Sequence, residues 1–138
     1  MSGEDQVHAV LDVSAMLSYA RGHVHVGELL TEMCDEDKSV AVPIITLLDA
    51  ATRLVGDTPG RTRLSVWATL PAVTVMSPTW QDAMDISTVV PFTSGDLARA
   101  HAVATAARFD VYYLTTEPHL VPAILDEELI VAIPEDDA

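Results

Sequence analysis

Four acidic residues stand out because of where they fall in the pattern of apolar runs. Asp12 directly follows one short apolar run, and Glu117 comes just after another. Asp96 opens an Ala-rich segment, and Asp49 lies on an otherwise apolar helical stretch. Each separation between neighbours in this set is long enough for at least one strand and one helix. Because ligands bind outside the carboxyl ends of the strands in an open α/β sheet, these four carboxylates can meet at one edge.

Carboxylates that converge in this way need a cation. They repel one another, and the low dielectric of a cleft makes that repulsion costly. Mg²⁺ and Mn²⁺ prefer oxygen ligands, keep several waters and engage phosphates. Two such ions a few Å apart activate water and stabilise the leaving oxygen in phosphodiester hydrolysis. The pattern therefore indicates metal-dependent cleavage of a phosphodiester.

Each acid also has a purely structural interpretation. Asp12 can cap a helix that starts near residue 14, and the run from Thr93 to Asp96 fits a capping pattern. Glu117 can be an ordinary loop residue. Asp49 is harder to explain in this way, because a carboxylate among apolar neighbours needs a partner or water. The functional interpretation depends on the four acids together.

Short apolar runs alternate with longer amphipathic segments along the whole chain. Strands are predicted over 7–11, 40–42, 72–76, 111–114 and 129–133. Helices are predicted over 14–20, 27–35, from Pro43 onward, 62–70, 78–87 and 96–109, with a short helical piece over 118–125 and a break at Gly56, Pro59 and Gly60. The strands are uniformly apolar, as expected for strands buried on both faces. This order predicts one domain over 1–138, a three-layer α/β/α sandwich with a mainly parallel five-stranded sheet and an acidic tail over 135–138.

Composition narrows the possible functions further. The 138 residues carry a formal net charge of −14. Of these residues, 49% are hydrophobic, which argues against a disordered or low-complexity chain. The charge argues against binding nucleic acid through a basic surface, but not through bound metal ions. The single cysteine, Cys34, excludes an internal disulfide and a Cys-based zinc site. His23 and His25 have no third ligand nearby, which favours a surface loop over a metal pair.

The chain shows no sign of a membrane or export segment. The N-terminus is polar and acidic, whereas a signal peptide has a positive start and an apolar run. No apolar stretch approaches the roughly 20 residues that span a bilayer. We therefore expect no membrane association and a cytoplasmic location.

Four motifs together resemble the PIN-domain nucleases. The segment Leu11-Asp12-Val13-Ser14 is similar to the end of that family's first strand, an Asp followed by a small residue and Ser. The segment 42–50 resembles the helix with the second acid, and 94–102 resembles the Ala-rich helix with the third. The segment 113–117 resembles the strand that ends in T-x-D. The resemblance covers nearly the whole chain and is greatest to the single-domain, VapC-type toxins of bacterial toxin–antitoxin pairs.

This resemblance implies a function and a set of site residues. It implies cleavage of single-stranded RNA that depends on Mg²⁺ or Mn²⁺, in a homodimeric protein with an antitoxin partner. The implied metal ligands and catalytic residues are Asp12, Asp49, Asp96 and Glu117. Ser14 and Thr115 are implied to support them through hydrogen bonds.

Two of the acids depart from the family pattern. The second acid is usually Glu and is Asp49 here, whereas the fourth is usually Asp and is Glu117 here. Each exchange changes the reach of the carboxylate by one methylene. The alternative is a PIN-fold protein without useful nuclease activity, whose acidic body binds a basic partner such as an antitoxin-like peptide.

Overall fold

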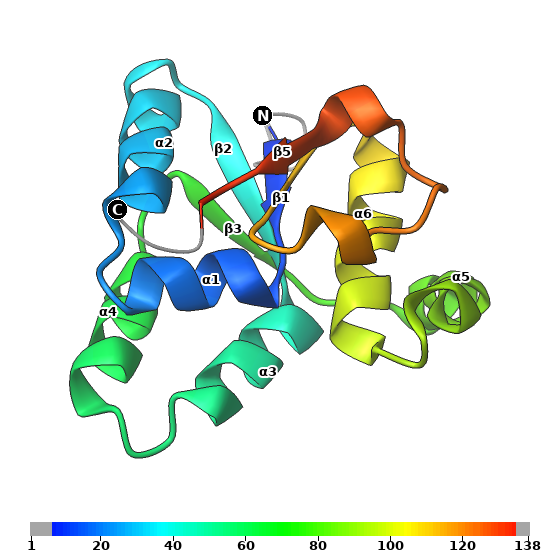
Figure 1. Ribbon diagram of the computed structural model, residues 1–138, viewed down its shortest axis with the longest axis horizontal. Helices are drawn as coiled ribbons and strands as arrows, with labels where there is room; N and C mark the ends of the chain where they lie inside the picture. The colour runs from blue at the N-terminus through cyan, green and yellow to red at the C-terminus, as the bar shows by residue number, and fades with distance from the viewer. Residues whose placement is uncertain (1–6, 135–138) are drawn as a thin grey trace.

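Five parallel strands form one sheet in the part of the protein that the structure describes (Figure 1). The computed structural model describes residues 7–134, so the acidic tail predicted over 135–138 lies outside the described residues. The strands are β1 (Val7–Leu11), β2 (Ser39–Pro43), β3 (Val73–Met76), β4 (Tyr112–Thr115) and β5 (Ile130–Ala132). They lie in the order β3-β2-β1-β4-β5, and every neighbouring pair is parallel. The predicted five-stranded parallel sheet is confirmed.

Helices cover both faces of this sheet, which confirms the three-layer architecture (Figure 1). The helices are α1 (Val13–Ala20), α2 (Val24–Asp35), α3 (Ile44–Arg53), α4 (Thr58–Trp67), α5 (Trp80–Val89) and α6 (Leu97–Phe109), with short 3₁₀ turns η2 (Val90–Thr93), η3 (Pro118–Leu120) and η4 (Glu127–Leu129). Helices α1 to α4 contribute to the core on one face, and α6 packs on the other with α5 against it. No helix within residues 7–134 has the length and apolar character needed to span a bilayer.

The central strands are buried because both of their faces are covered. Ala9 and Leu11 of β1 belong to the core beneath α1 to α4, whereas Val10 belongs to the core beneath α6. The same alternation divides β4, where Leu114 faces the first core and Tyr113 the second. Side chains alternate between the faces of a strand, so an unbroken apolar run is what a doubly covered strand requires.

Helix α4 begins four residues earlier than the sequence pattern predicts. The predicted break at Pro59 and Gly60 is wrong, because both residues lie in the first turn of this helix. Proline is tolerated there, since the first N–H groups of a helix have no partner within it. The Asp57 carboxylate caps the helix by accepting a hydrogen bond of 3.0 Å from the Gly60 N–H.

Other boundaries differ from the predictions as well. Helix α2 begins at Val24 rather than at Gly27, so His25 lies in a helix and not in the predicted surface loop. Pro43 is the last residue of β2 and precedes α3, rather than being the first residue of that helix. Helix α5 begins at Trp80, after a capping box in which Thr79 and Asp82 bond each other's backbone N–H. The helical piece predicted over 118–125 is only the short turn η3, so the chain reaches β5 mainly as irregular structure.

Candidate functional site: an acidic cluster around Arg99

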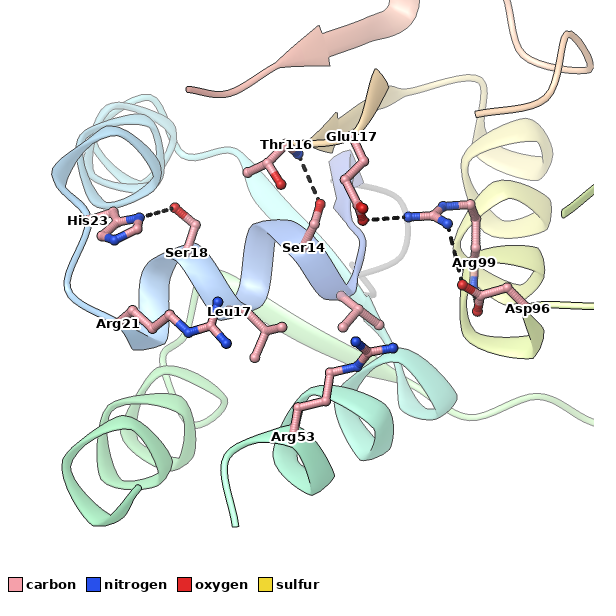
Figure 2. A pocket seen from close by; sticks show the side chains of 11 residues that line it. Ser14, Leu17, Ser18, Arg21, His23, Arg53, Asp96, Arg99, Thr116 and Glu117 are labelled. Carbon is pink, nitrogen blue, oxygen red and sulfur yellow. Dashed lines mark hydrogen bonds and ion pairs between the residues drawn. The ribbon is translucent and has the colours of Figure 1, made fainter. Parts of the chain in front are cut away.

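The fold brings three of the four predicted acids to one edge of the sheet. Asp12 directly follows β1, and Glu117 follows β4 by two residues. These strands are parallel neighbours, so their carboxyl ends lie side by side, and the Asp12 N–H donates to the Leu114 carbonyl at 3.2 Å. Helix α6 begins at the same edge with Asp96 as its capping residue (Figure 2).

Asp12 uses its two carboxylate oxygens differently. Oδ1 accepts hydrogen bonds from the Ser14 hydroxyl at 2.6 Å and from the Ala15 N–H at 3.0 Å, which caps α1. Oδ2 accepts one from the Tyr113 hydroxyl at 3.2 Å and lies 3.9 Å from Nη2 of Arg99. Asp12 is only 1% exposed. Its structural role as a cap therefore leaves one oxygen directed toward the cluster.

Arg99 is the group on which the acids converge. Asp96 caps α6 through Oδ1, which accepts the Arg99 N–H at 3.0 Å, and its Oδ2 lies 3.4 Å from Nη1 of the same arginine. Oε1 of Glu117 accepts a hydrogen bond from Nη2 at 2.8 Å (Figure 2). With Asp12 at 3.9 Å, one guanidinium contacts carboxylates from three separate parts of the chain.

Burial and charge act in opposite directions on the ionisation of this cluster. Burial raises the pKa of Asp12, while hydrogen bonds from the hydroxyls of Ser14 and Thr115 and the charge of Arg99 oppose that rise. Burial lowers the pKa of Arg99, but the negative charges of its neighbours outweigh it and the net pKa is raised. Burial, followed by the charge of Asp12, raises the pKa of Tyr113. Tyr113 is therefore a protonated donor at neutral pH.

Two hydroxyls connect the ends of β1 and β4. The Ser14 hydroxyl, besides donating to Asp12, accepts a hydrogen bond from the Thr116 N–H at 2.9 Å and lies 3.2 Å from the Thr115 hydroxyl. The Thr115 hydroxyl oxygen accepts one from the Glu117 N–H at 2.9 Å. The two predicted supporting residues thus contact the acids or their backbone, and they fix the loop after β4 against the start of α1.

Asp49 is the one predicted acid that the structure does not bring into contact with Arg99. It lies on α3 and accepts a hydrogen bond of 2.9 Å from Nε of Arg53, one turn later on the same helix. This hydrogen bond, followed by the charges of Asp49, Asp96 and Glu117, raises the pKa of Arg53. Asp49 is therefore near the cluster but is paired with its own arginine.

A pocket of about 550 Å³ opens beside the cluster. Asp96 and Glu117 line one part of it. Arg21, which directly follows α1, and Arg53 of α3 line another part, and their guanidinium groups extend toward the same space (Figure 2). With Arg99, three of the chain's seven basic residues border this one pocket. In a chain with a net charge of −14, this concentration gives the pocket both an anionic and a cationic wall.

The acids do not form a closed metal site in this structure. Within residues 7–134, no group of three or more His, Cys, Asp or Glu side chains is close enough to hold a metal ion. The guanidinium of Arg99 lies among the three carboxylates, so their oxygens surround a cationic side chain. The chemical character of the donors, hard carboxylate oxygens, nevertheless suits Mg²⁺ or Mn²⁺.

Sequence reasoning missed the basic residues of the site. Arg99 carries a detectable signal, because it is a charged residue within the Ala-rich segment that is predicted to be a packed helix, and a buried charge needs a partner. Arg21 and Arg53 carry no such signal, since arginines at the ends of helices are common on protein surfaces. Tyr113 could be anticipated only as a core residue of β4.

Comparison with protein-family models gives no match, and comparison with curated proteins gives none either. The function is therefore inferred from the site itself and from the motifs that resemble the PIN-domain nucleases.

Proposed function

We propose that this protein is a metal-dependent endoribonuclease of the PIN type that hydrolyses single-stranded RNA. The observation that carries the proposal is the convergence of Asp12, Asp96 and Glu117 on one cationic group at the carboxyl edge of a parallel sheet. Carboxylates are gathered from separate segments at this edge, beside a pocket large enough for a nucleotide-sized group.

Asp12, Asp96 and Glu117 would hold the Mg²⁺ or Mn²⁺. Asp49 would join them only if its carboxylate left Arg53. When bound, the ion supplies an activated water and a positive charge for the developing oxyanion. The buried carboxylate of Asp12 is held in one orientation by Ser14 and by Tyr113, so it does not have to reorganise for this purpose.

The basic side chains that line the pocket would bind the phosphates of the RNA in this otherwise acidic protein. Arg21 and Arg53 face the pocket, and a guanidinium binds phosphate oxygens through paired N–H donors. His23 lies at the same rim, with Nδ1 at 3.3 Å from the Ser18 hydroxyl. In this arrangement, phosphates flanking the cleaved bond lie on the cationic wall while that bond faces the carboxylates.

The test is cleavage of an end-labelled single-stranded RNA with Mn²⁺ or Mg²⁺, comparing wild type with Asp12→Asn. Asparagine keeps an oxygen that can cap α1, so the variant should fold. Asp57→Asn is the matched control, because Asp57 also caps a helix but lies at α4, outside the residues that line the pocket. Cleavage that requires metal, survives in Asp57→Asn and is lost in Asp12→Asn supports the proposal. Cleavage that persists in Asp12→Asn or in EDTA contradicts it.

A second function is favoured by one specific observation, the pairing of every predicted acid with an arginine. Asp49 is paired with Arg53, and the other three acids with Arg99, so no predicted ligand lacks a cationic neighbour. A protein in this state can act as a binding module, whose acidic surface takes a basic partner such as an antitoxin-like peptide. Titration with Mn²⁺ separates the two functions, since a binding module of this kind takes up no ion that depends on Asp12 and Asp96.

The resemblance to VapC-type toxins extends the proposal to the biological setting. We propose on that basis that the protein works in the cytoplasm as a homodimer and that an antitoxin protein is its partner. Size-exclusion chromatography with light scattering tests the homodimer directly.

A further inference from the structure

Arg99 has the contacts that a bound cation would have. Its guanidinium is 2.8 Å from Glu117, 3.4 Å from Asp96 and 3.9 Å from Asp12, and only 11% of its side chain is exposed. We infer that Arg99 is an internal cation that competes with a divalent metal ion for these three carboxylates, so that metal binding requires the guanidinium to withdraw. This inference rests on the proposed function, because it assumes that the acids are able to bind the ion.

Electrostatic repulsion among the three carboxylates favours a cation between them. A carboxylate cluster without a cation is unfavourable at low dielectric, and Asp12 is almost fully buried. In the absence of metal, the guanidinium of Arg99 places a positive charge among the three carboxylates and reduces their mutual repulsion. An ion that enters must then replace an interaction that already exists, which lowers its apparent affinity.

The guanidinium of Arg99 does not satisfy all of its hydrogen-bond donors in this position. Within the described residues, Nε of Arg99 is buried and has no hydrogen-bond partner. Its approach to Asp12 is 3.9 Å, longer than a hydrogen bond. A buried donor that is left unpaired costs free energy, so the side chain is held in place by charge more than by a complete set of hydrogen bonds. An ion that supplies the charge can therefore displace it.

The neighbouring pocket has room for the Arg99 side chain once a metal ion has displaced it. Arg99 lines the pocket of about 550 Å³, so its guanidinium can turn into that space by rotating its side-chain bonds while α6 stays in place. In the pocket, the Arg99 guanidinium would lie on the same side as Arg21 and Arg53. A phosphate of the RNA would pair with it there in place of the carboxylates. Metal and substrate would then bind with positive coupling, because the metal releases a guanidinium that the phosphate uses.

The test is a calorimetric titration of Mn²⁺ into the metal-free full chain. Arg99→Met removes the charge and keeps most of the side-chain volume. Arg108→Met is the matched control, since Arg108 lies on the same helix, loses the same charge and contacts Asp82 outside the cluster. We expect Arg99→Met to bind Mn²⁺ at least about tenfold more tightly than wild type and Arg108→Met to differ by less than about twofold. Arg99→Lys, which keeps the charge, should remain near wild type.

Equal Mn²⁺ affinity of Arg99→Met and Arg108→Met overturns the inference while leaving the nuclease proposal intact. Absence of Mn²⁺ binding in wild type and in every variant overturns both, and identifies Arg99 as a purely structural counter-ion. Tighter Mn²⁺ binding by Arg99→Met without RNA cleavage by any form supports the inference and contradicts the nuclease.

Folding of the variant is controlled separately. If Arg99→Met is unfolded without metal, circular dichroism during Mn²⁺ addition follows its refolding, and Arg99→Gln gives a second neutral variant. Refolding of Arg99→Met by Mn²⁺ supports the inference. Failure to refold, together with wild-type affinity in Arg99→Gln, contradicts it.

Discussion

The hydrogen bond from Tyr113 to Asp12 provides the most quantitative prediction of the structure. The hydroxyl donates to Oδ2 at 3.2 Å, Asp12 is 1% exposed and Tyr113 is fully buried. Burial raises the pKa of Asp12, so each hydrogen bond to its ionised form stabilises a charge that water cannot reach. Tyr113→Phe removes this donor and leaves the ring packing unchanged.

A hydrogen bond to a charged group contributes about 1.5–3 kcal/mol, and the 3.2 Å length places this one toward the lower end. We therefore expect Tyr113→Phe to lower the free energy of unfolding by about 1.5–2 kcal/mol, equivalent to a fall in Tm of roughly 5–10 °C for a chain of this size. Urea unfolding at pH 7 measures the change, with an unaltered m value. Tyr112→Phe is the matched control, because Tyr112 is the preceding residue of β4 and is 51% exposed, so its removal should cost less than about 0.5 kcal/mol.

A double-mutant cycle with Asp12→Asn shows whether the two side chains act as a pair. We expect a coupling energy of about 1 kcal/mol or more, because the residues are in direct contact. A cost for Tyr113→Phe no greater than that for Tyr112→Phe, or a coupling energy near zero, would refute the view that Asp12 is a buried carboxylate held by this hydroxyl.

Three further predictions concern other parts of the molecule. Burial lowers the pKa of His101, so as the pH falls the histidine is protonated in the unfolded chain before it is protonated in the folded protein. The free energy of unfolding should therefore fall as the pH drops below about 6.5. Urea unfolding at pH 7.5 and 5.5 should show this loss in wild type and a smaller loss in His101→Gln. Gly60→Ala should lower the free energy of unfolding by about 1 kcal/mol in the same assay, because the new Cβ would lie 2.6 Å from the Asp57 carboxylate that caps α4. Gly27→Ala, where nothing lies near the new Cβ in α2, should raise it by about 0.5–1 kcal/mol. Arg53→Gln should weaken binding of single-stranded RNA in EDTA and reduce the salt slope by about one, whereas Arg108→Gln should do neither, as measured by fluorescence anisotropy.

The sequence predicted the architecture well because its signals are local and repeated. Strand β1 begins and ends where predicted, because the apolar run stops at Asp12 and so marks the end of the strand. The start of α4 was missed because Pro59 and Gly60 usually interrupt helices, and only the cap at Asp57 makes them acceptable in a first turn.

The site was predictable in part, for a different reason. Asp12 and Asp96 each serve as a helix cap and as a member of the cluster, with one oxygen for each role. The structural and functional interpretations of these acids are therefore compatible. The position of Arg99 among the acids was not predictable, because it depends on how α6 meets the ends of β1 and β4.

The most direct test of the acidic cluster is a crystal structure of the protein grown or soaked with Mn²⁺, with anomalous diffraction to locate the ion. We expect an anomalous peak at bonding distance from carboxylate oxygens of Asp12 and Asp96, with Glu117 at the ion directly or through water and the Arg99 guanidinium turned into the pocket. Arg99 still bound to all three carboxylates at saturating Mn²⁺, with no anomalous peak among them, would contradict it.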